Sequence, residues 1–256
     1  MFRKLTLALA TGLALAVAGA AHAQEPLRIG VEGAYPPFSK KESDGTLTGF
    51  DIDIANALCA KLERECQLIE QDWDGMIPAL KAGKFDAIVA SMSITPERKQ
   101  QVDFSEKYYQ TPARFVAKKG AELDISPEGL KGKRIGVQRG TTHQCYLDKK
   151  YPDAEIVMYG TQEEVYQDLA LGRLDAQLSD SIAANDGFLT KDAGKDFEFV
   201  GGDQVDECFG EGAGIAVRKE DTELRDQLSG AIKAIRDDGT YEGINKKYFD
   251  FDIYGG

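Results

Sequence analysis

The chain has 256 residues, and its 43 acidic side chains outnumber its 31 basic ones, so its formal net charge is −12 at pH 7. Such an acidic chain lacks the positive surface that nucleic acids require, and its charge argues against a general anion binder. The charge is compatible with a cationic ligand, although most of it is expected on solvated surface. The length suits one large domain or two lobes, each with its own core.

The first 23 residues are expected to be a secretory signal peptide. Arg3 and Lys4 precede an apolar run that continues to Ala18, and a small-x-small cleavage pattern ends at Ala23. The apolar run is too short for a stable membrane span. We therefore expect a soluble, exported chain that begins at Gln24. Because the removed segment has two basic residues and no acidic ones, the charge of the mature chain is −14.

Four cysteines in an exported chain suggest disulfides. Cys59 and Cys66 are seven residues apart, which on one continuous helix places them about 10 Å apart, beyond disulfide reach. A bridge between them is feasible only if the helix ends in between, and residues 61–65 have the character of such an end. For Cys145 and Cys208 the sequence leaves both a second bridge and two free thiols open.

The first half of the chain predicts alternating strands and helices. The expected elements are a strand over 27–31, a helix over 50–62, a second helix that opens at 71–74, and strands over 85–89 and 114–117. The first helix is predicted because Phe50, Ile54 and Leu58 recur every four residues. Thr95 then has the character of an N-cap, with Pro96 at the first position of a short helix.

The second half repeats this order. Residues 134–140 resemble residues 28–33, and residues 171–176 resemble residues 82–87. Two matches in the same order indicate an internal repeat of the strand–helix–strand–helix–strand type, which is typical of parallel α/β sheets. A last strand over 214–218 and a helix around 224–235 suggest that the chain returns to the first lobe.

Ligands of open α/β sheets bind beyond the carboxyl ends of the strands. If the two copies face each other, the polar residues at these ends converge on one crevice. These residues are Glu32, Ser91, Ser93 and Arg98 in the first copy, and Gln138, Thr141, Thr142 and Asp180 in the second.

The crevice is suited to the two charges of an amino acid. Arg98 is expected in the first turn of a helix, where the helix dipole disfavours a cation unless an anion binds there. Arg98 and the backbone N–H groups near Ser93 and Thr142 can hold an α-carboxylate. Asp180 and the Ser91 hydroxyl can accept the α-ammonium. A strand end with solvated serines is the alternative for the first copy alone, and the repeat argues against it.

Acidic and aromatic residues are predicted farther out in the crevice. Glu32 and Asp51, with Tyr35 and Trp73, suit a cationic side chain through charge pairing and stacking. Core packing is an equal alternative for the two aromatic residues, and a helix N-cap is an equal alternative for Asp51.

The sequence does not support catalysis, a metal site or a cofactor. His143 is the only histidine outside the signal segment, and its place at a helix start suggests a cleft wall or a solvated residue rather than a catalytic base. No cluster has metal-ligand spacing. The pair Gly30 and Gly33 does not form a dinucleotide-binding fingerprint.

Five motifs make the chain resemble the periplasmic polar amino-acid solute-binding proteins (bacterial solute-binding family 3), near the lysine/arginine/ornithine- and histidine-binding members. They are GFDIDIA at 49–55, WDGMIP at 73–78, SMSITPER at 91–98, GVQRGTT at 136–142 and KYF at 247–249. The resemblance spans essentially the whole mature chain. It implies an α/β fold of the type II periplasmic binding protein kind, with parallel or mixed sheets and two hinge crossings, near 110–113 and 205–213. The expected divisions are a signal peptide at 1–23, lobe 1 at 24–110 and 206–256, and lobe 2 at 111–205.

The resemblance also implies roles for the crevice residues and supports the Cys59–Cys66 bridge. The α-carboxylate and α-ammonium partners are the ones reasoned above, while Tyr35 and Trp73 would sandwich the ligand side chain, with Glu32 near its charged end. The full expected ligand set is Glu32, Tyr35, Asp51, Trp73, Ser91, Met92, Ser93, Arg98, Gln138, Thr141, Thr142 and Asp180.

The implied function is that of a monomeric periplasmic receptor that presents a basic L-amino acid to an inner-membrane ABC permease. A zwitterion uses Arg98 and Asp180, so Glu32 is left for a cationic side chain, and Gln138 adds an acceptor that suits a guanidinium. We expect arginine and ornithine first, then lysine and histidine. Glu32, Ala90 and Gln138 depart from several relatives at the side-chain end. An opine receptor, a periplasmic dehydratase on the same fold and a sensor domain of a membrane kinase are the alternatives.

Overall fold

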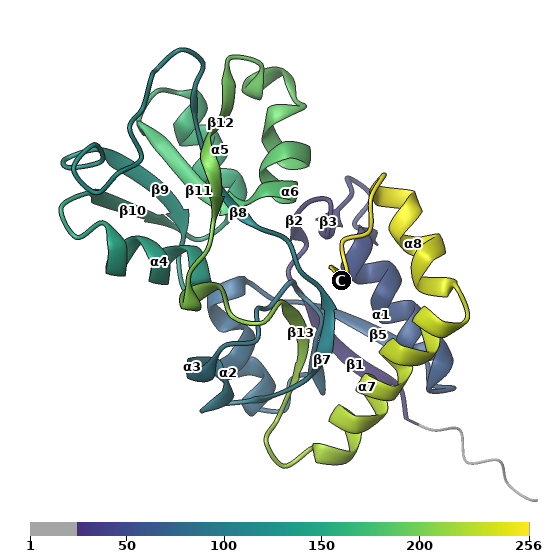
Figure 1. Cartoon of the computed structure of the whole chain (residues 1–256). Coiled ribbons are helices and arrows are strands. Elements are labelled where there is room, and N and C mark those ends of the chain that lie inside the picture. Colours follow the sequence, from purple (N-terminus) through teal and green to yellow (C-terminus); the bar gives the residue numbers. More distant parts are fainter. Residues whose placement is uncertain (1–24, 256) are drawn as a thin grey trace, which may run out of the picture.

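The computed structural model describes residues 25–255 and has two lobes, each built on a five-stranded sheet (Figure 1). The predicted signal peptide lies outside the described residues. Within residues 25–255, no helix combines the length and apolar character needed to cross a membrane.

Lobe 1 is the part of the molecule that contains the sheet with strand order β5-β1-β6-β13-β7. The parallel pairs β1–β5 and β1–β6 are followed by β13, which runs antiparallel to both β6 and β7. Its strands are β1 (Leu27–Val31), β5 (Cys66–Glu70), β6 (Ala87–Ile88), β7 (Asp103–Tyr109) and β13 (Ala213–Val217). Its helices are α1 (Phe50–Lys61), α2 (Met76–Lys81), α3 (Pro96–Lys99), α7 (Thr222–Asp237) and α8 (Thr240–Tyr248), and a small sheet contains β2 (Ala34–Tyr35), β3 (Ser39–Lys41) and β4 (Leu47–Thr48).

Lobe 2 contains the second sheet, with strand order β10-β9-β11-β8-β12. Its strands are β8 (Ala113–Lys118), β9 (Arg134–Gln138), β10 (Glu155–Tyr159), β11 (Ala176–Asp180) and β12 (Phe197–Gln204). Its helices are α4 (Thr142–Lys150), α5 (Gln162–Ala170), α6 (Ser181–Ala184) and the π-helix η2 (Asn185–Leu189), with the 3₁₀ turn η3 (Asp192–Gly194). A further 3₁₀ turn, η4 (Glu207–Phe209), follows β12 in the connection that leaves this sheet. In each lobe a parallel core is joined to antiparallel strands, so the predicted α/β fold with mixed sheets is confirmed.

The chain passes between the two sheets twice (Figure 1). The first passage joins β7 to β8, and the second leaves β12, forms η4 and enters β13. The carboxyl ends of β1 and β6 in lobe 1, and of β9 and β11 in lobe 2, therefore supply the residues that lie between the lobes. Each lobe has its own hydrophobic core beneath this region.

The N-cap predicted at Thr95 is confirmed, and α5 has a cap of the same short-range kind. Thr95 Oγ1 accepts a hydrogen bond from Arg98 N (3.2 Å), with Pro96 as the first residue of α3. Thr161 and Glu164 form the reciprocal capping box of α5. These caps use residues three apart in the chain, which is why they can be found without tertiary information.

The element that begins at Trp73 differs from the prediction. Residues Trp73–Gly75 form the 3₁₀ turn η1, and the α-helix begins only at Met76. Pro78 explains this start, because a proline lacks the N–H of an interior helical residue and fits only in the first turn. The strand expected over 85–89 is also shorter, since only Ala87–Ile88 pair on both sides.

Both cysteine pairs are bridged in the structure. Helix α1 ends at Lys61 and β5 begins at Cys66, so the helix end needed for the Cys59–Cys66 bridge is present, with 5.7 Å between the Cα atoms. Cys145 and Cys208 form a second disulfide with a Cα separation of 5.9 Å. The alternative that the sequence left open is thereby decided in favour of a bridge.

Candidate binding site between the lobes

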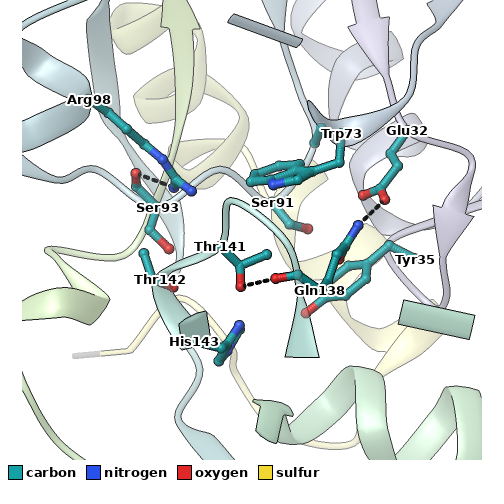
Figure 2. Close-up of a pocket in the computed structure, with 11 residues that line it drawn as sticks. Glu32, Tyr35, Trp73, Ser91, Ser93, Arg98, Gln138, Thr141, Thr142 and His143 are labelled. Carbon is teal, nitrogen blue, oxygen red and sulfur yellow. Dashed lines mark hydrogen bonds between the residues drawn. The ribbon is translucent and has the colours of Figure 1, made fainter. Parts of the chain in front are cut away.

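Two adjoining cavities between the lobes form one cleft. Tyr35, Ser91, Ser93, Thr142 and His143 line both cavities. Ten of the twelve predicted ligand residues line the cleft, and Figure 2 shows most of them facing it. These ten are Glu32, Tyr35, Trp73, Ser91, Ser93, Arg98, Gln138, Thr141, Thr142 and Asp180.

Arg98 is held by both lobes. Its guanidinium donates hydrogen bonds to the carbonyl oxygens of Ser93 in lobe 1 (3.0 Å) and Gly140 in lobe 2 (3.2 Å), and it lies 5.2 Å from the centre of the Trp73 ring. Burial lowers the pKa of Arg98 to about 10, so the group stays charged at neutral pH. A half-buried cation whose hydrogen bonds go to neutral carbonyls is well placed to receive a carboxylate from outside.

The N-terminus of α4 lies beside Arg98 in the cleft. Thr141 caps the helix by accepting a hydrogen bond from Gln144 N (3.3 Å), and its own hydroxyl donates to Gln138 O (2.7 Å). Thr142 is the first residue of α4 and lines both cavities. The first N–H groups of a helix have no intrahelical partner and favour an anion. At this end of the cleft, Arg98 of lobe 1 and the start of α4 in lobe 2 can therefore bind the same carboxylate.

Ser91 is held in an unusual backbone conformation at the cleft floor. Its φ of 54° is in the left-handed region, which is uncommon for a residue other than glycine. Its N–H donates to Tyr108 Oη (3.0 Å), and its hydroxyl donates to Asp51 Oδ2 (2.9 Å). Tyr108 Oη in turn donates to Asp51 Oδ1 (2.9 Å). Because the Ser91 proton is engaged with Asp51, the hydroxyl presents lone pairs to the cleft.

Asp51 and Met92 are the two predicted ligand residues that do not line these cavities. Asp51 is fully buried beneath the floor and orients Ser91 through the contacts above, and burial raises its pKa to about 7. The alternative of a helix cap also fails, because the N-cap of α1 is Gly49. Met92 is 1% exposed and packs in the core of lobe 1. The prediction that Met92 lines the cleft was wrong, because the irregular segment around it has no periodicity that indicates which way the side chain points.

Asp180 lies on the lobe 2 side of the cleft. One carboxylate oxygen accepts hydrogen bonds from Ile182 N (2.8 Å) and Ala183 N (3.1 Å), and the other is bonded to the Thr111 hydroxyl. Burial raises the pKa of Asp180 to about 6. The side chain is therefore the N-cap of α6, and its free lone pairs remain available to an ammonium group.

The opposite end of the cleft is acidic. Glu32 Oε1 accepts a hydrogen bond from Gln138 Nε2 (2.6 Å) across the lobes, and Figure 2 shows the two side chains pointing toward each other. Burial raises the pKa of Glu32 to about 7, and the bond from Gln138 opposes this rise. At the rim, Arg139 and Asp74 form an ion pair between the lobes (2.9 Å) in which both side chains are about half exposed.

Several residues that line the cleft were not in the predicted ligand set. They are Ala90, Tyr109, Gln110, Thr111, Ala113, His143, Phe209, Gly212 and Ala213. His143 was expected as a cleft wall or a solvated residue, and it is a wall; burial and the Arg98 charge lower its pKa to about 3, so its ring is neutral. The position of His143 directly after Thr142 could have indicated that it lines the cleft. Thr111 and Phe209 lie in the two passages between the lobes, where no local sequence pattern indicates a cleft residue.

Comparison with known proteins places this cleft in a family. The model for bacterial extracellular solute-binding proteins, family 3, matches residues 27–251. The L-arginine-binding protein of Pseudomonas aeruginosa is 53% identical over 236 residues, 91% of each chain. The histidine-binding periplasmic protein of Escherichia coli K12 is 46% identical over 259 residues, 99% of this chain and 100% of that protein.

A solved structure gives the same result for the fold. An ancestral arginine-binding protein bound to arginine has a TM-score of 0.82 and 39% identity, over 89% of this chain and 100% of that chain. The resemblance found from the five sequence motifs is thus confirmed, and with it the type II periplasmic binding protein fold. The chain belongs to the bacterial extracellular solute-binding proteins of family 3.

Proposed function

We propose that this protein is a periplasmic receptor for a basic L-amino acid, with arginine and ornithine preferred over lysine and histidine. The observation that carries the proposal is the charge pattern of the cleft. Arg98 and α4 suit an α-carboxylate, Asp180 and Ser91 suit an α-ammonium, and Glu32 is a further buried acid whose bonded partner, Gln138, is neutral. Closing the lobes around an unpaired carboxylate is costly, and a cationic side chain offsets this cost.

We further propose how the receptor works. Lobe 1 (24–110 and 206–256) and lobe 2 (111–205) close on the ligand by a hinge motion at 110–113 and 205–213. The signal peptide is removed after Ala23, and the closed monomer presents its ligand to an inner-membrane ABC permease. The names of the arginine- and histidine-binding relatives support a basic amino acid.

A thermal-shift screen tests the ligand class. The mature protein is melted with each amino acid, with polyamines and with opines at one pH, because a ligand raises the melting temperature by mass action. Arginine and ornithine should give the largest shifts. If glutamine or glutamate gave the largest shift, the proposal of a cationic ligand would be contradicted. If an opine gave a larger shift than arginine, the proposed ligand would change from arginine to an opine. Turnover of prephenate or arogenate would contradict a receptor.

A further inference from the structure

The Cys145–Cys208 disulfide connects a wall of the cleft to the passage that returns from lobe 2 to lobe 1. Cys208 lies in η4, is 5% exposed and packs in the core of lobe 2. The bridge joins residues 63 apart in the chain. It therefore fixes the point from which the second passage leaves lobe 2.

On one side, the bridge holds the helix whose first turn lines the cleft. Cys145 lies three residues after Thr142 in α4, so the two residues lie on neighbouring positions of one helix face. Thr142 and His143 both line the cleft. Fixing Cys145 consequently limits any tilt or slide of this N-terminus relative to η4.

On the other side, the passage is bonded to the lobe 1 segment that carries Ser93. Glu211 N donates to Ile94 O (3.0 Å), Ile94 N donates to Gly212 O (2.8 Å), and Ser93 is a ladder partner of Ala213. The carbonyl of Ser93 is the one that accepts the hydrogen bond from Arg98. The return passage therefore lies against the lobe 1 half of the carboxylate site only a few residues after Cys208.

The connection between the two sides is short and closely seated. Gly210 and Gly212 have φ values of 71° and 99°, and both approach other backbone atoms closely. A Cβ at Gly210 would lie 2.1 Å from Ile94 O, and a Cβ at Gly212 would lie 2.8 Å from Tyr109 O. Because glycine has no Cβ, the backbone at these two positions can adopt positive φ values and pack directly against its neighbours. The contact leaves no room for independent movement, so a displacement of η4 would also displace the segment that carries Ser93.

We propose that the Cys145–Cys208 disulfide is a positioning element of the ligand site, because it keeps Thr142 in register with Ser93 and Arg98 across the cleft. The inference rests on the proposed function as an amino-acid receptor. The second bridge of the molecule offers a contrast. Cys66 pairs with Leu27 at the start of β1, whereas the cleft lies beyond the other end of that strand, so Cys59–Cys66 stabilises lobe 1 without touching the site.

The experiment compares two double variants with the wild-type protein. Cys145→Ser/Cys208→Ser removes the positioning bridge, and Cys59→Ser/Cys66→Ser is the matched control. Calorimetry with L-arginine gives Kd, and stopped-flow fluorescence of Trp73, the only tryptophan, gives the dissociation rate. We expect the Cys145/Cys208 variant to bind about tenfold more weakly, with faster dissociation, because preorganisation is lost. The control should keep the wild-type Kd even though both variants melt earlier.

The outcomes separate this inference from the proposed function. Unchanged Kd in a folded Cys145/Cys208 variant, with only a lower melting temperature, would overturn the positioning role alone. A wild-type protein that binds no amino acid would overturn both. If the variant does not fold, two glycines inserted between Phe209 and Gly210 loosen the same connection with both bridges intact; this insertion should also weaken binding about tenfold, and unchanged affinity would contradict the proposal.

Discussion

Gln138 donates a hydrogen bond to Glu32 across the cleft, with 2.6 Å between the amide nitrogen and the carboxylate oxygen. Gln138 is the last residue of β9 and Glu32 follows β1, so this bond joins the lobes at the acidic end of the cleft. In this structure the hydrogen-bond partner of the Glu32 carboxylate is therefore a neutral amide. A cationic ligand that reaches this point must compete with an amide, which is a weaker partner for a carboxylate than a charged donor.

Glu32→Gln should narrow the preference for arginine over glutamine. The substitution removes the buried acid that disfavours a neutral side chain, so arginine should lose about 2–5 kcal/mol of binding free energy while glutamine loses little or gains. Calorimetry with both ligands measures the difference. Asp74→Asn, which removes an acid at the exposed rim, is the control and should leave the preference intact. Equal losses for both ligands in Glu32→Gln would contradict this role.

Arg98→Ala should nearly abolish binding and leave the fold intact. The change removes the half-buried cation proposed to face the ligand carboxylate, with an expected loss of about 2–5 kcal/mol. Arg98→Lys should recover little, because an ammonium cannot reproduce the planar fork of a guanidinium. Arg139→Ala removes an arginine from the rim and is the control for calorimetry; because its ion pair with Asp74 contributes at most about 1 kcal/mol, it should weaken binding at most several-fold. Binding by Arg98→Ala within a few-fold of wild type would show that Arg98 does not bind the ligand.

Arginine affinity should rise with pH through about 7, the raised pKa of Glu32. In the free protein Glu32 is largely protonated below this pH, and a cationic side chain favours the ionised form, so binding releases a proton. Affinity is therefore lost as the pH falls below about 7, and Asp180, with a pKa near 6, extends the loss at lower pH.

Calorimetry in two buffers with different ionisation enthalpies measures the released protons. At a pH slightly below 7, the apparent binding enthalpy of the wild-type protein should depend on the buffer. Glu32→Gln should remove most of this dependence, which makes it the matched control. An affinity for arginine that stays constant from about pH 5.5 to 8 would show that Glu32 does not face the ligand cation.

Tyr108→Phe should reduce both stability and affinity. The hydroxyl bonds both Asp51 and the N–H of Ser91, so its loss leaves two groups without this partner and should cost about 1–3 kcal/mol of unfolding free energy. Ser91 can then relax from its left-handed conformation, which should weaken arginine binding. Tyr241→Phe removes a buried hydroxyl that donates to Tyr108 O (2.7 Å) and is the control. Chemical denaturation and calorimetry should show that only Tyr108→Phe changes Kd.

Local sequence signals predicted much of the cleft lining but not the residues that support it from below. Arg98 and Thr142 were found because each lies within a few residues of an N-cap, and a cap is a short-range pattern. Asp51 was given the wrong role because its partner Tyr108 is 57 residues away, on a strand whose packing the sequence does not specify. A buried acid and a ligand-binding acid look alike in a sequence, and only the three-dimensional neighbours distinguish them.

The second disulfide shows the same limit at longer range. Cys145 and Cys208 are 63 residues apart, and their approach depends on how η4 packs against α4 after the chain has completed the second sheet. The Cys59–Cys66 bridge could be judged from helix geometry because a single helix end decides it. Strand order and the seating of the passages likewise depend on contacts between distant segments, so the sequence supplied the class of fold without these details.

If the lobes close by the proposed hinge motion, the ion pair between Arg139 and Asp74 makes that closure sensitive to ionic strength. Both side chains are about half exposed, so dissolved salt screens their attraction, with a Debye length of about 10 Å at 0.1 M. Such a pair contributes at most about 1 kcal/mol, yet that is enough to change an opening rate several-fold. A ligand held in this cleft would therefore escape sooner in a saline medium than in a dilute one, although none of the groups that touch it had changed.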